Sequence, residues 1–438
     1  MHSAANTAAL GKCAEGHHSR AARASAVVPR LELADIFRQF GAEYRRTHSL
    51  LPSQYKALLD IVNCRTAALG GRLEKCNHCG HEYPVYCSCS NRHCPKCQQL
   101  AKAKWLEARH AELLPVPYFH AVFTLPHVLN PLLFDNQRLL YHLLFECVSK
   151  TLREFAADPR HGLGGKLGFI ALLHTWDQQL NYHVHLHCLI PAGVLACDKQ
   201  HWIHARPNYL FDVEALSLVF RGKFREGLQD AYENKQLRFS AQTAQCKSQS
   251  AFRSLIAQLY KTKWVVYLKP PFNGPAQSLD YLARYTQRIA ISNSRLLKLQ
   301  NGRVYFRYRD RRDGDRLKET DLSADEFIHC FLQHVLPKAF VRLRHFGFLA
   351  NGCKQFSLQR CRELLHAGPP LPKPPRKTVQ EWMKKLTGVD VALCPHCRVG
   401  KLVFVRELLP QCPTLHRPQL QLRRSTATAS QGQAGDTS

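Results

Sequence analysis

The chain has 438 residues and a formal net charge of +28 at pH 7. This length predicts two or three domains with a large buried core, and the charge indicates a polyanionic partner, for which nucleic acid is favoured over an anionic membrane surface. The apolar stretches near residues 113–134 are broken by prolines and histidines, and residues 1–30 hold no apolar run of signal-peptide length. We therefore expect no membrane association and a cytoplasmic location.

Two helices are expected after a flexible arm at residues 1–30. Apolar positions over residues 31–44 recur at helical spacing. Pro52 begins a second helix, which Gly70 and Gly71 would end.

Six cysteines follow between Cys76 and Cys97. Two Cys-x-x-Cys knuckles separated by 14 residues fit one tetrahedral structural zinc ion, whose predicted ligands are Cys76, Cys79, Cys94 and Cys97. Alternative ligands for this ion, or for a second site, are Cys87, Cys89, His78, His81 and His93. Disulfides are the less favoured interpretation because the chain has no secretion signal.

The middle of the chain alternates strands with helices. The expected elements are a polar helix near 98–112, a strand at 119–125, an amphipathic helix near 137–155, a hairpin of 167–176 with 182–190, helices within 215–262, a strand at 264–269, a helix at 276–287 and a hairpin within 302–317 that turns at Asp313 and Gly314.

Three histidines alternate with apolar residues in the strand at 182–190. Because side chains alternate sides along a strand, His183, His185 and His187 fall on one face, at a spacing that suits a metal ion. An incomplete ligand shell would leave room for substrate, which makes this a catalytic candidate. The alternative is a half-buried strand whose histidines only form hydrogen bonds.

The expected helix at 276–287 carries two tyrosines on one face. Tyr281 and Tyr285 are four residues apart, and Arg288 follows on the same side. This group suits phosphoryl transfer, with a tyrosine oxygen as nucleophile and an arginine to stabilise phosphate charge. The helix alone would favour the alternative, two amphipathic interface tyrosines. The neighbouring histidine strand and the basic charge favour the chemical interpretation.

Arginines and aromatic residues interleave over residues 303–309. Arg303 and Arg307 are candidates to pair with phosphates while the rings stack on unpaired bases. The alternative is a hairpin that packs Val304, Phe306 and Tyr308 inward and leaves the arginines solvated, and both interpretations are compatible.

Beyond these elements, the C-terminal part contains a further knuckle. Cys394 and Cys397 have only Cys412 and His416 downstream as partners, so a small zinc ribbon and an unmetallated turn are equal alternatives. The tail after Pro418 is of low complexity and is predicted to be disordered.

From residue 31 to residue 354 the chain resembles a known family. The landmarks are 64–71, 88–98, 123–127, 174–176, the histidine strand, 264–271, 281–285 with 289–293, and 345–351. Together they are similar to the rolling-circle transposases of the insertion sequence 91 type, which belong to a class named for its His-hydrophobic-His metal motif.

The resemblance implies an α+β fold, with a central antiparallel sheet and flanking helices in the catalytic domain and a helical zinc-binding domain before it. The implied limits are an arm at 1–30, the zinc-binding domain at 31–112, the catalytic domain at 113–350, a C-terminal region with the further knuckle at 351–417, and a tail at 418–438. The family motif maps onto His185 and His187, with His183 joining them or lying just outside. Gln178 and Gln287 are the candidates for a third ligand.

The resemblance also implies the reaction. Mg²⁺ or Mn²⁺ on the histidines would assist cleavage of single-stranded DNA at the element ends by Tyr281 or Tyr285, giving a 5′-phosphotyrosine link. Arg284 or Arg288 would help the phenolate form. Competing interpretations are a plasmid replication initiator or relaxase, a non-catalytic zinc-dependent DNA-binding regulator, and a zinc hydrolase acting on a small substrate. The cysteine module argues against the first, and the charge has no role in the last.

Overall fold

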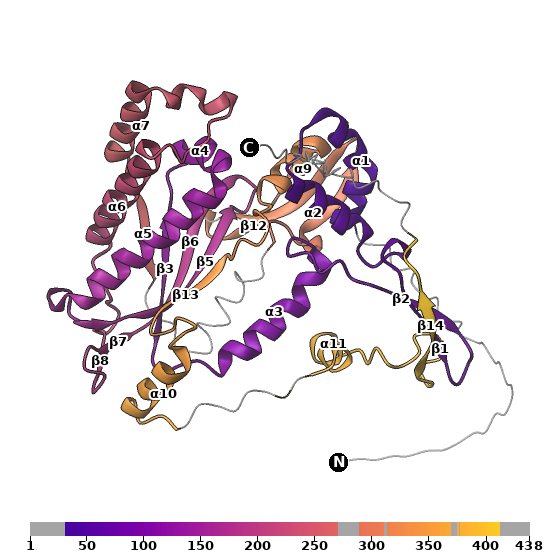
Figure 1. The fold of residues 1–438 in the computed structure, drawn as a ribbon. Helices are drawn as coiled ribbons and strands as arrows, with labels where there is room; N and C mark the ends of the chain where they lie inside the picture. The colour runs from indigo at the N-terminus through magenta and orange to yellow at the C-terminus, as the bar shows by residue number, and fades with distance from the viewer. Residues whose placement is uncertain (1–30, 270–288, 311–312, 369–374, 376, 412–438) are drawn as a thin grey trace, which may run out of the picture. The chain divides into compact units, whose positions relative to one another are not determined.

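The computed structural model describes residues 31–269, 289–310, 313–368, 375 and 377–411, and Figure 1 labels its helices and strands. Within these residues, no helix combines the length and the apolar character needed to cross a bilayer.

An antiparallel sheet, with strands in the order β13-β5-β6-β3-β9, forms the centre of the fold (Figure 1). Its strands are β3 (Tyr118–Thr124), β5 (Gly168–Trp176), β6 (Tyr182–Pro191), β9 (Val265–Lys269) and β13 (Leu343–Gly347). Every residue of β5 is buried, and so is every residue of β6 except His183, which is half-buried. The two central strands are therefore covered on both faces.

Helices cover one face of this sheet. They are α4 (Asn130–Asp135), α5 (Gln137–Ala157), α6 (Val213–Glu233) and α7 (Gln249–Lys261). Alternate strand residues join these helices in one apolar cluster, and they include Phe119, Ala121, Phe123, Phe169, Ala171, Leu173, Val184, Leu186, Cys188 and Ile190. Removing this apolar surface from water stabilises the sheet and fixes which strand residues point the other way.

The opposite face carries the histidines and a smaller apolar cluster. Tyr118, Ile170 and Leu189 pack there with Phe348 and with Leu358. Leu358 lies on α10 (Lys354–Leu364), and α3 (Pro95–His110) contributes partly buried side chains to the same cluster. The same face also carries five histidines of these strands, which are His120, His174, His183, His185 and His187, so it is polar where they lie side by side.

Two smaller sheets lie outside the central one. One joins β4 (Gly165–Lys166), β7 (Gly193–Ala196) and β8 (Trp202–His204), and the other joins β10 (Leu296–Gln300), β11 (Arg303–Asp310) and β12 (Arg316–Ser323). Apolar residues of β10 and β11 cluster with α9 (Ala324–Gln333) and with the first two helices, α1 (Leu33–Thr47) and α2 (Pro52–Asn63). The amino-terminal helices thus share a core with residues far along the chain. Short 3-10 helices lie at 67–69, 127–129, 159–161, 241–247 and 293–295.

A third small sheet brings distant segments together. Its order is β14-β1-β2, formed by β1 (Gly71–Cys76), β2 (Glu82–Tyr86) and β14 (Leu402–Leu408), and Figure 1 shows β14 beside β1. The register pairs Gly71 with Leu408 and Cys76 with Leu402. One further helix, α11 (Val379–Thr387), precedes β14.

The predicted fold class, α+β with a central antiparallel sheet and flanking helices, is confirmed. The hairpin predicted at 167–176 and 182–190 is β5 with β6. The sequence analysis did not predict β1 and β2. Three of the five residues of β2 are exposed and the other two are half-buried, so its sequence lacks the alternation that marks a half-buried strand. The predicted limits of the domains stay predictions.

Candidate active site and cysteine clusters

Three buried histidines meet on the polar face of the central sheet. His174 lies on β5, and His185 and His187 lie on β6, with donor nitrogens all within 4.8 Å of one another. The Nε2 atoms of His185 and His187 are 3.1 Å apart. The ring of His174 stands edge-on to both, 4.6 Å from the His187 centroid and 5.5 Å from the His185 centroid.

Alternation along β5 places His174 in this group. Phe169, Ala171 and Leu173 pack in the apolar cluster, so His174 lies on the opposite face of the strand. It pairs with His185 in the register that holds from Ile170 onward, and the register shifts only after His174.

Hydrogen bonds orient the two β6 imidazoles. The Nδ1 atom of His185 is 2.9 Å from the backbone oxygen of His183, so it donates there and leaves Nε2 as the acceptor of a neutral ring. The Nδ1 atom of His187 is 2.9 Å from Nε2 of His120 on β3. When His187 binds a cation through Nε2, its Nδ1–H donates to His120. Such an outer partner orients a ligating imidazole.

The geometry fits a metal ion. Two unprotonated nitrogens 3.1 Å apart repel each other unless a proton or a cation lies between them. Two nitrogens bound about 2.1 Å from one ion would lie roughly 3.0–3.4 Å apart, depending on the coordination geometry. Among the described residues, this group has three imidazoles and no carboxylate. Its donor set therefore suits a transition ion better than Mg²⁺.

Some of the predicted metal ligands lie in this group and others do not. His185 and His187 come together as expected, whereas His183 is not in the group, and its ring stacks on His127 with centroids 5.0 Å apart. Gln178 lies in the turn between β5 and β6, where its backbone oxygen accepts a hydrogen bond from Arg295. Gln287 lies outside the described residues. His174 takes the third position, and the sequence analysis missed it.

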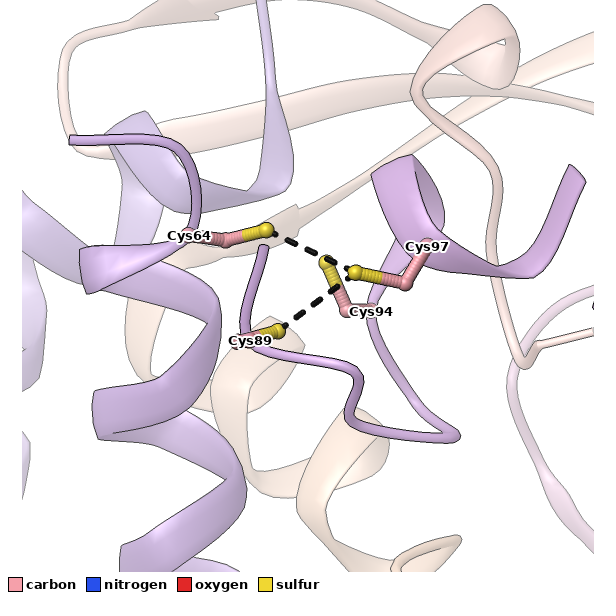
Figure 2. Close-up of side chains that lie close together, drawn as sticks. All are labelled: Cys64, Cys89, Cys94 and Cys97. Carbon is pink, nitrogen blue, oxygen red and sulfur yellow. Dashed lines mark hydrogen bonds between the residues drawn. The ribbon is translucent and has the colours of Figure 1, made fainter. Parts of the chain in front are cut away.

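Four cysteines from the amino-terminal part form a first cluster (Figure 2). Cys64 follows α2, Cys89 lies in a loop, and Cys94 and Cys97 lie at the start of α3. The Sγ atom of Cys97 is 3.6 Å from that of Cys64 and 3.7 Å from that of Cys89. Hydrogen bonds, first from Cys64 and then from Cys89 and Cys94, lower the pKa of Cys97. Hydrogen bonding with Cys89 and then Cys94 lowers the pKa of Cys64 to about 7. Thiolates are the form that zinc binds.

The structure corrects the predicted grouping of Cys76, Cys79, Cys94 and Cys97 into one site. Cys94 and Cys97 belong to the first cluster, and Cys76 and Cys79 lie in a second cluster with the knuckle Cys394–Cys397. The physical reason is the pairing of β1 with β14, which places residues 71–76 beside residues 402–408. No sequence spacing signals a contact across 315 residues.

The alternative zinc ligands also have defined places. Cys87 and His78 belong to neither cluster, and the ring of His81 stacks on His396. His93 is buried, and its Nε2 accepts a hydrogen bond from Leu336 N at 3.4 Å. Burial, and then the neighbouring cations Arg342 and Arg92, lower the pKa of His93 to about 3. It is a neutral core residue.

Two regions of the chain match known protein families. Residues 168–356 match a family described as putative transposase, and residues 36–125 match a transposase zinc-binding domain. A putative transposase of Sinorhizobium fredii (strain NBRC 101917 / NGR234), y4qJ, is 46% identical over 377 residues, covering 85% of this chain and 94% of the relative. The transposase for insertion sequence element IS801 of Pseudomonas savastanoi pv. phaseolicola is 32% identical over 349 residues, covering 78% of this chain and 82% of the relative. No solved structure matches.

This chain belongs to the insertion sequence 91 family of transposases. The three histidines of the transposase lie within the first matched region, and the first cysteine cluster lies within the zinc-binding domain. Cys394 and Cys397 lie outside both regions.

The other predicted residues of the transposase fall into two sets. The predicted nucleophiles Tyr281 and Tyr285, with Arg284 and Arg288, lie outside the described residues. Arg303 and Arg307 are exposed on β11, where Val304 and Phe306 are fully buried and Tyr308 is half-buried. Arg303 forms an ion pair with Asp321, and Arg307 Nε lies 3.3 Å from Glu319. The strand therefore packs one face and exposes two arginines on the other.

Both flanks of the tyrosine segment are anchored near the histidines. Lys269 ends β9 and pairs with His120, whose ring contacts His187. On the other side, Ala290 shares a hydrophobic cluster with Trp176, and the Trp176 ring stacks on His174.

Proposed function

We propose that this transposase cleaves and rejoins single-stranded DNA at the ends of its element through a 5′-phosphotyrosine intermediate. The observation that carries the proposal is the group of His174, His185 and His187, whose donor nitrogens converge within 4.8 Å on one face of the central sheet. These residues would hold the catalytic ion, for which Mg²⁺ and Mn²⁺ are the candidates. When bound, the ion supplies Lewis-acid polarisation of the scissile phosphate.

The tyrosines would supply the covalent chemistry. The phenol oxygen of Tyr281 or Tyr285 loses its proton and attacks the phosphorus, and the bond from phosphorus to the 3′ oxygen breaks. The departing 3′ oxygen takes up a proton, and the 5′ phosphate stays on the tyrosine. Because the link conserves the phosphodiester energy, a later 3′-hydroxyl can reverse the step without ATP. Two tyrosines allow two successive cuts, one at each element end.

Basic residues would favour both the phenolate and the DNA. A free phenol has a pKa of about 10, so Arg284 or Arg288 is needed near the nucleophile to stabilise its charged form. The net charge of +28 supports binding of the phosphate backbone. The exposed Arg303 and Arg307 are candidate phosphate contacts. A DNA substrate also agrees with the cytoplasmic location expected for a bacterial protein.

We further propose that the first cysteine cluster holds structural zinc. Cys64, Cys89, Cys94 and Cys97 offer four sulfur atoms, and the zinc-binding domain to which they belong supports zinc as the ion. A zinc ion there would connect the end of α2 to the start of α3 (Figure 2). This position stabilises the amino-terminal domain and takes no part in the strand cleavage.

The test is a covalent-adduct assay. Purified transposase is incubated with Mn²⁺ and single-stranded DNA from either element end, labelled at the 5′ or the 3′ terminus, and the products are separated on denaturing gels. We expect a protein-linked species that retains the 3′ label and not the 5′ label, because the tyrosine holds the 5′ phosphate of the fragment downstream of the break. Tyr281→Phe or Tyr285→Phe should remove it, whereas Tyr260→Phe, an exposed tyrosine on α7, should leave it unchanged.

The same assay separates the competing functions. DNA binding without an adduct, across both ends and across Mg²⁺ and Mn²⁺, would favour a non-catalytic DNA-binding regulator. An adduct that survives the double Tyr281→Phe/Tyr285→Phe substitution would disprove the assignment of the nucleophiles. An adduct formed only on plasmid origin or transfer sequences, and never on the element ends, would favour a replication initiator or relaxase.

A further inference from the structure

We propose that Cys76, Cys79, Cys394 and Cys397 form a second structural zinc site, which fastens the C-terminal strand β14 to the amino-terminal strand β1. The proposal concerns the architecture of the chain and is independent of the strand-transfer chemistry. We name this group the clasp cluster. Its first knuckle closes the end of β1, and its second knuckle precedes β14.

The sulfur geometry of the clasp cluster is that of a zinc site and not of disulfides. The Sγ atoms of Cys76 and Cys397 are 3.6 Å apart, and those of Cys79 and Cys394 are 3.7 Å apart. Sulfurs bound about 2.3 Å from a tetrahedral zinc ion lie about 3.8 Å apart. A disulfide would bring two sulfurs to about 2.05 Å.

Backbone amides point at two of these sulfurs. The N–H groups of His78 and Cys79 each donate to Cys76 Sγ at 3.4 Å, and the N–H of Gly400 donates to Cys397 Sγ at 3.4 Å. Hydrogen bonds to a thiolate favour its charged form, which is the form that binds a metal. Both knuckles therefore have the backbone hydrogen bonds of a metal-binding loop.

The two knuckles fit each other closely. The N–H of Asn77 donates to the oxygen of Lys401 at 3.0 Å, and the N–H of Lys401 donates to Asn77 Oδ1 at 2.8 Å. A Cβ on Gly400 would lie 2.4 Å from Cys76 Sγ, so a residue without a side chain is required there. These contacts specify one partner for each loop.

The sheet around the clasp cluster has too little core to stabilise itself. Val403, Phe404 and Val405 on β14 are 52%, 58% and 45% exposed. A small sheet without a buried apolar face is marginal in water. A metal bound only by the folded arrangement contributes its binding free energy to folding, and this supplies the stabilisation that hydrophobic burial does not. Zinc on the clasp cluster would thus hold β14 on β1.

The first test is the zinc content of full-length transposase that carries His185→Ala and His187→Ala, so that the histidine group binds no zinc. We expect two zinc ions per chain, measured by plasma mass spectrometry on the reduced protein after dialysis, and the zinc counts below use the same background. One ion per chain would overturn the proposal, because the first cysteine cluster accounts for it. A disulfide between any two of the four clasp cysteines, found by non-reducing peptide mapping of protein purified under reducing conditions, would overturn it as well.

Matched variants locate the second ion. Cys394→Ser/Cys397→Ser should leave one zinc ion per chain, while Cys197→Ser/Cys353→Ser, which changes two exposed cysteines outside both clusters, should keep two. Cys397→His retains a ligand type that zinc accepts and should keep two ions. Two ions in the Cys394→Ser/Cys397→Ser protein would overturn the proposal.

Limited proteolysis tests whether the clasp cluster holds β14 on β1. Arg398, Lys401 and Arg406 lie in or beside β14, and trypsin should cut after them faster in Cys394→Ser/Cys397→Ser than in wild type. Equal cutting rates in the two proteins would contradict a fastening role for the site. Formation of the covalent DNA adduct by the same variant would separate this result from the proposed function.

Discussion

His120 offers the sharpest test of the histidine site, because it is buried behind a proposed ligand and has no role as a ligand itself. Its Nε2 atom is 2.9 Å from His187 Nδ1, and both side chains are almost fully buried. His120→Ala removes the acceptor for the His187 Nδ1–H that a metal-bound ring requires. Water has little access to replace it.

The expected magnitude follows from that hydrogen bond. A buried donor that loses its partner costs about 1–3 kcal/mol. Removing the outer partner of a ligating histidine lowers metal affinity by about 10–100-fold, which is about 1.4–2.7 kcal/mol. The cost of the lost hydrogen bond and the loss of metal-binding free energy therefore fall in the same range. His120→Gln keeps an acceptor oxygen near the same place and should recover most of the affinity.

The assay is titration of the zinc-loaded transposase with Mn²⁺, with free ion counted by electron paramagnetic resonance. His183→Ala is the control, because that ring is outside the group of three and should change affinity by less than about threefold. Circular dichroism checks that each variant is folded. A folded His120→Ala protein with wild-type Mn²⁺ affinity would refute the reasoning, as would a loss in His183→Ala equal to that in His187→Ala.

Two further predictions concern stability and DNA affinity. Burial lowers the pKa of His334 to about 4, from about 6.5 when unfolded, so its contribution to the free energy of unfolding is present above about pH 6.5 and is lost as the pH falls toward 4. Urea unfolding at pH 7 and pH 5 should show a pH-dependent loss about 2 kcal/mol smaller in His334→Gln than in wild type, and equal losses would exclude His334 as the cause. Arg303→Ala and Arg307→Ala should each reduce the slope of log affinity for single-stranded DNA against log salt by about 0.7, if each arginine exchanges its carboxylate partner for a phosphate. An unchanged slope in both variants would remove β11 from the DNA-binding surface.

Much of the candidate site follows from local sequence. Period-two alternation in β6 places His185 and His187 on the face opposite Val184 and Leu186. Burial of the apolar residues fixes which face of the strand the histidines occupy. The paired cysteine knuckles likewise indicate zinc from their spacing. In each case the residues lie within a few positions of one another, so local backbone geometry sets the relative positions of their side chains.

The remainder depended on long-range pairing, which a sequence pattern does not encode. His174 joins His185 only because β5 pairs with β6 in a register that sets these two residues opposite each other. The cysteines were regrouped because β14 pairs with β1, which joins Cys79 to Cys394 across 315 residues. The sequence by itself therefore determined which residue types are candidates for the chemistry and which face of β6 the histidines occupy. Only the tertiary structure decided the partners, because the register of β5 on β6 and a distant strand pairing are set by the packing of the whole chain.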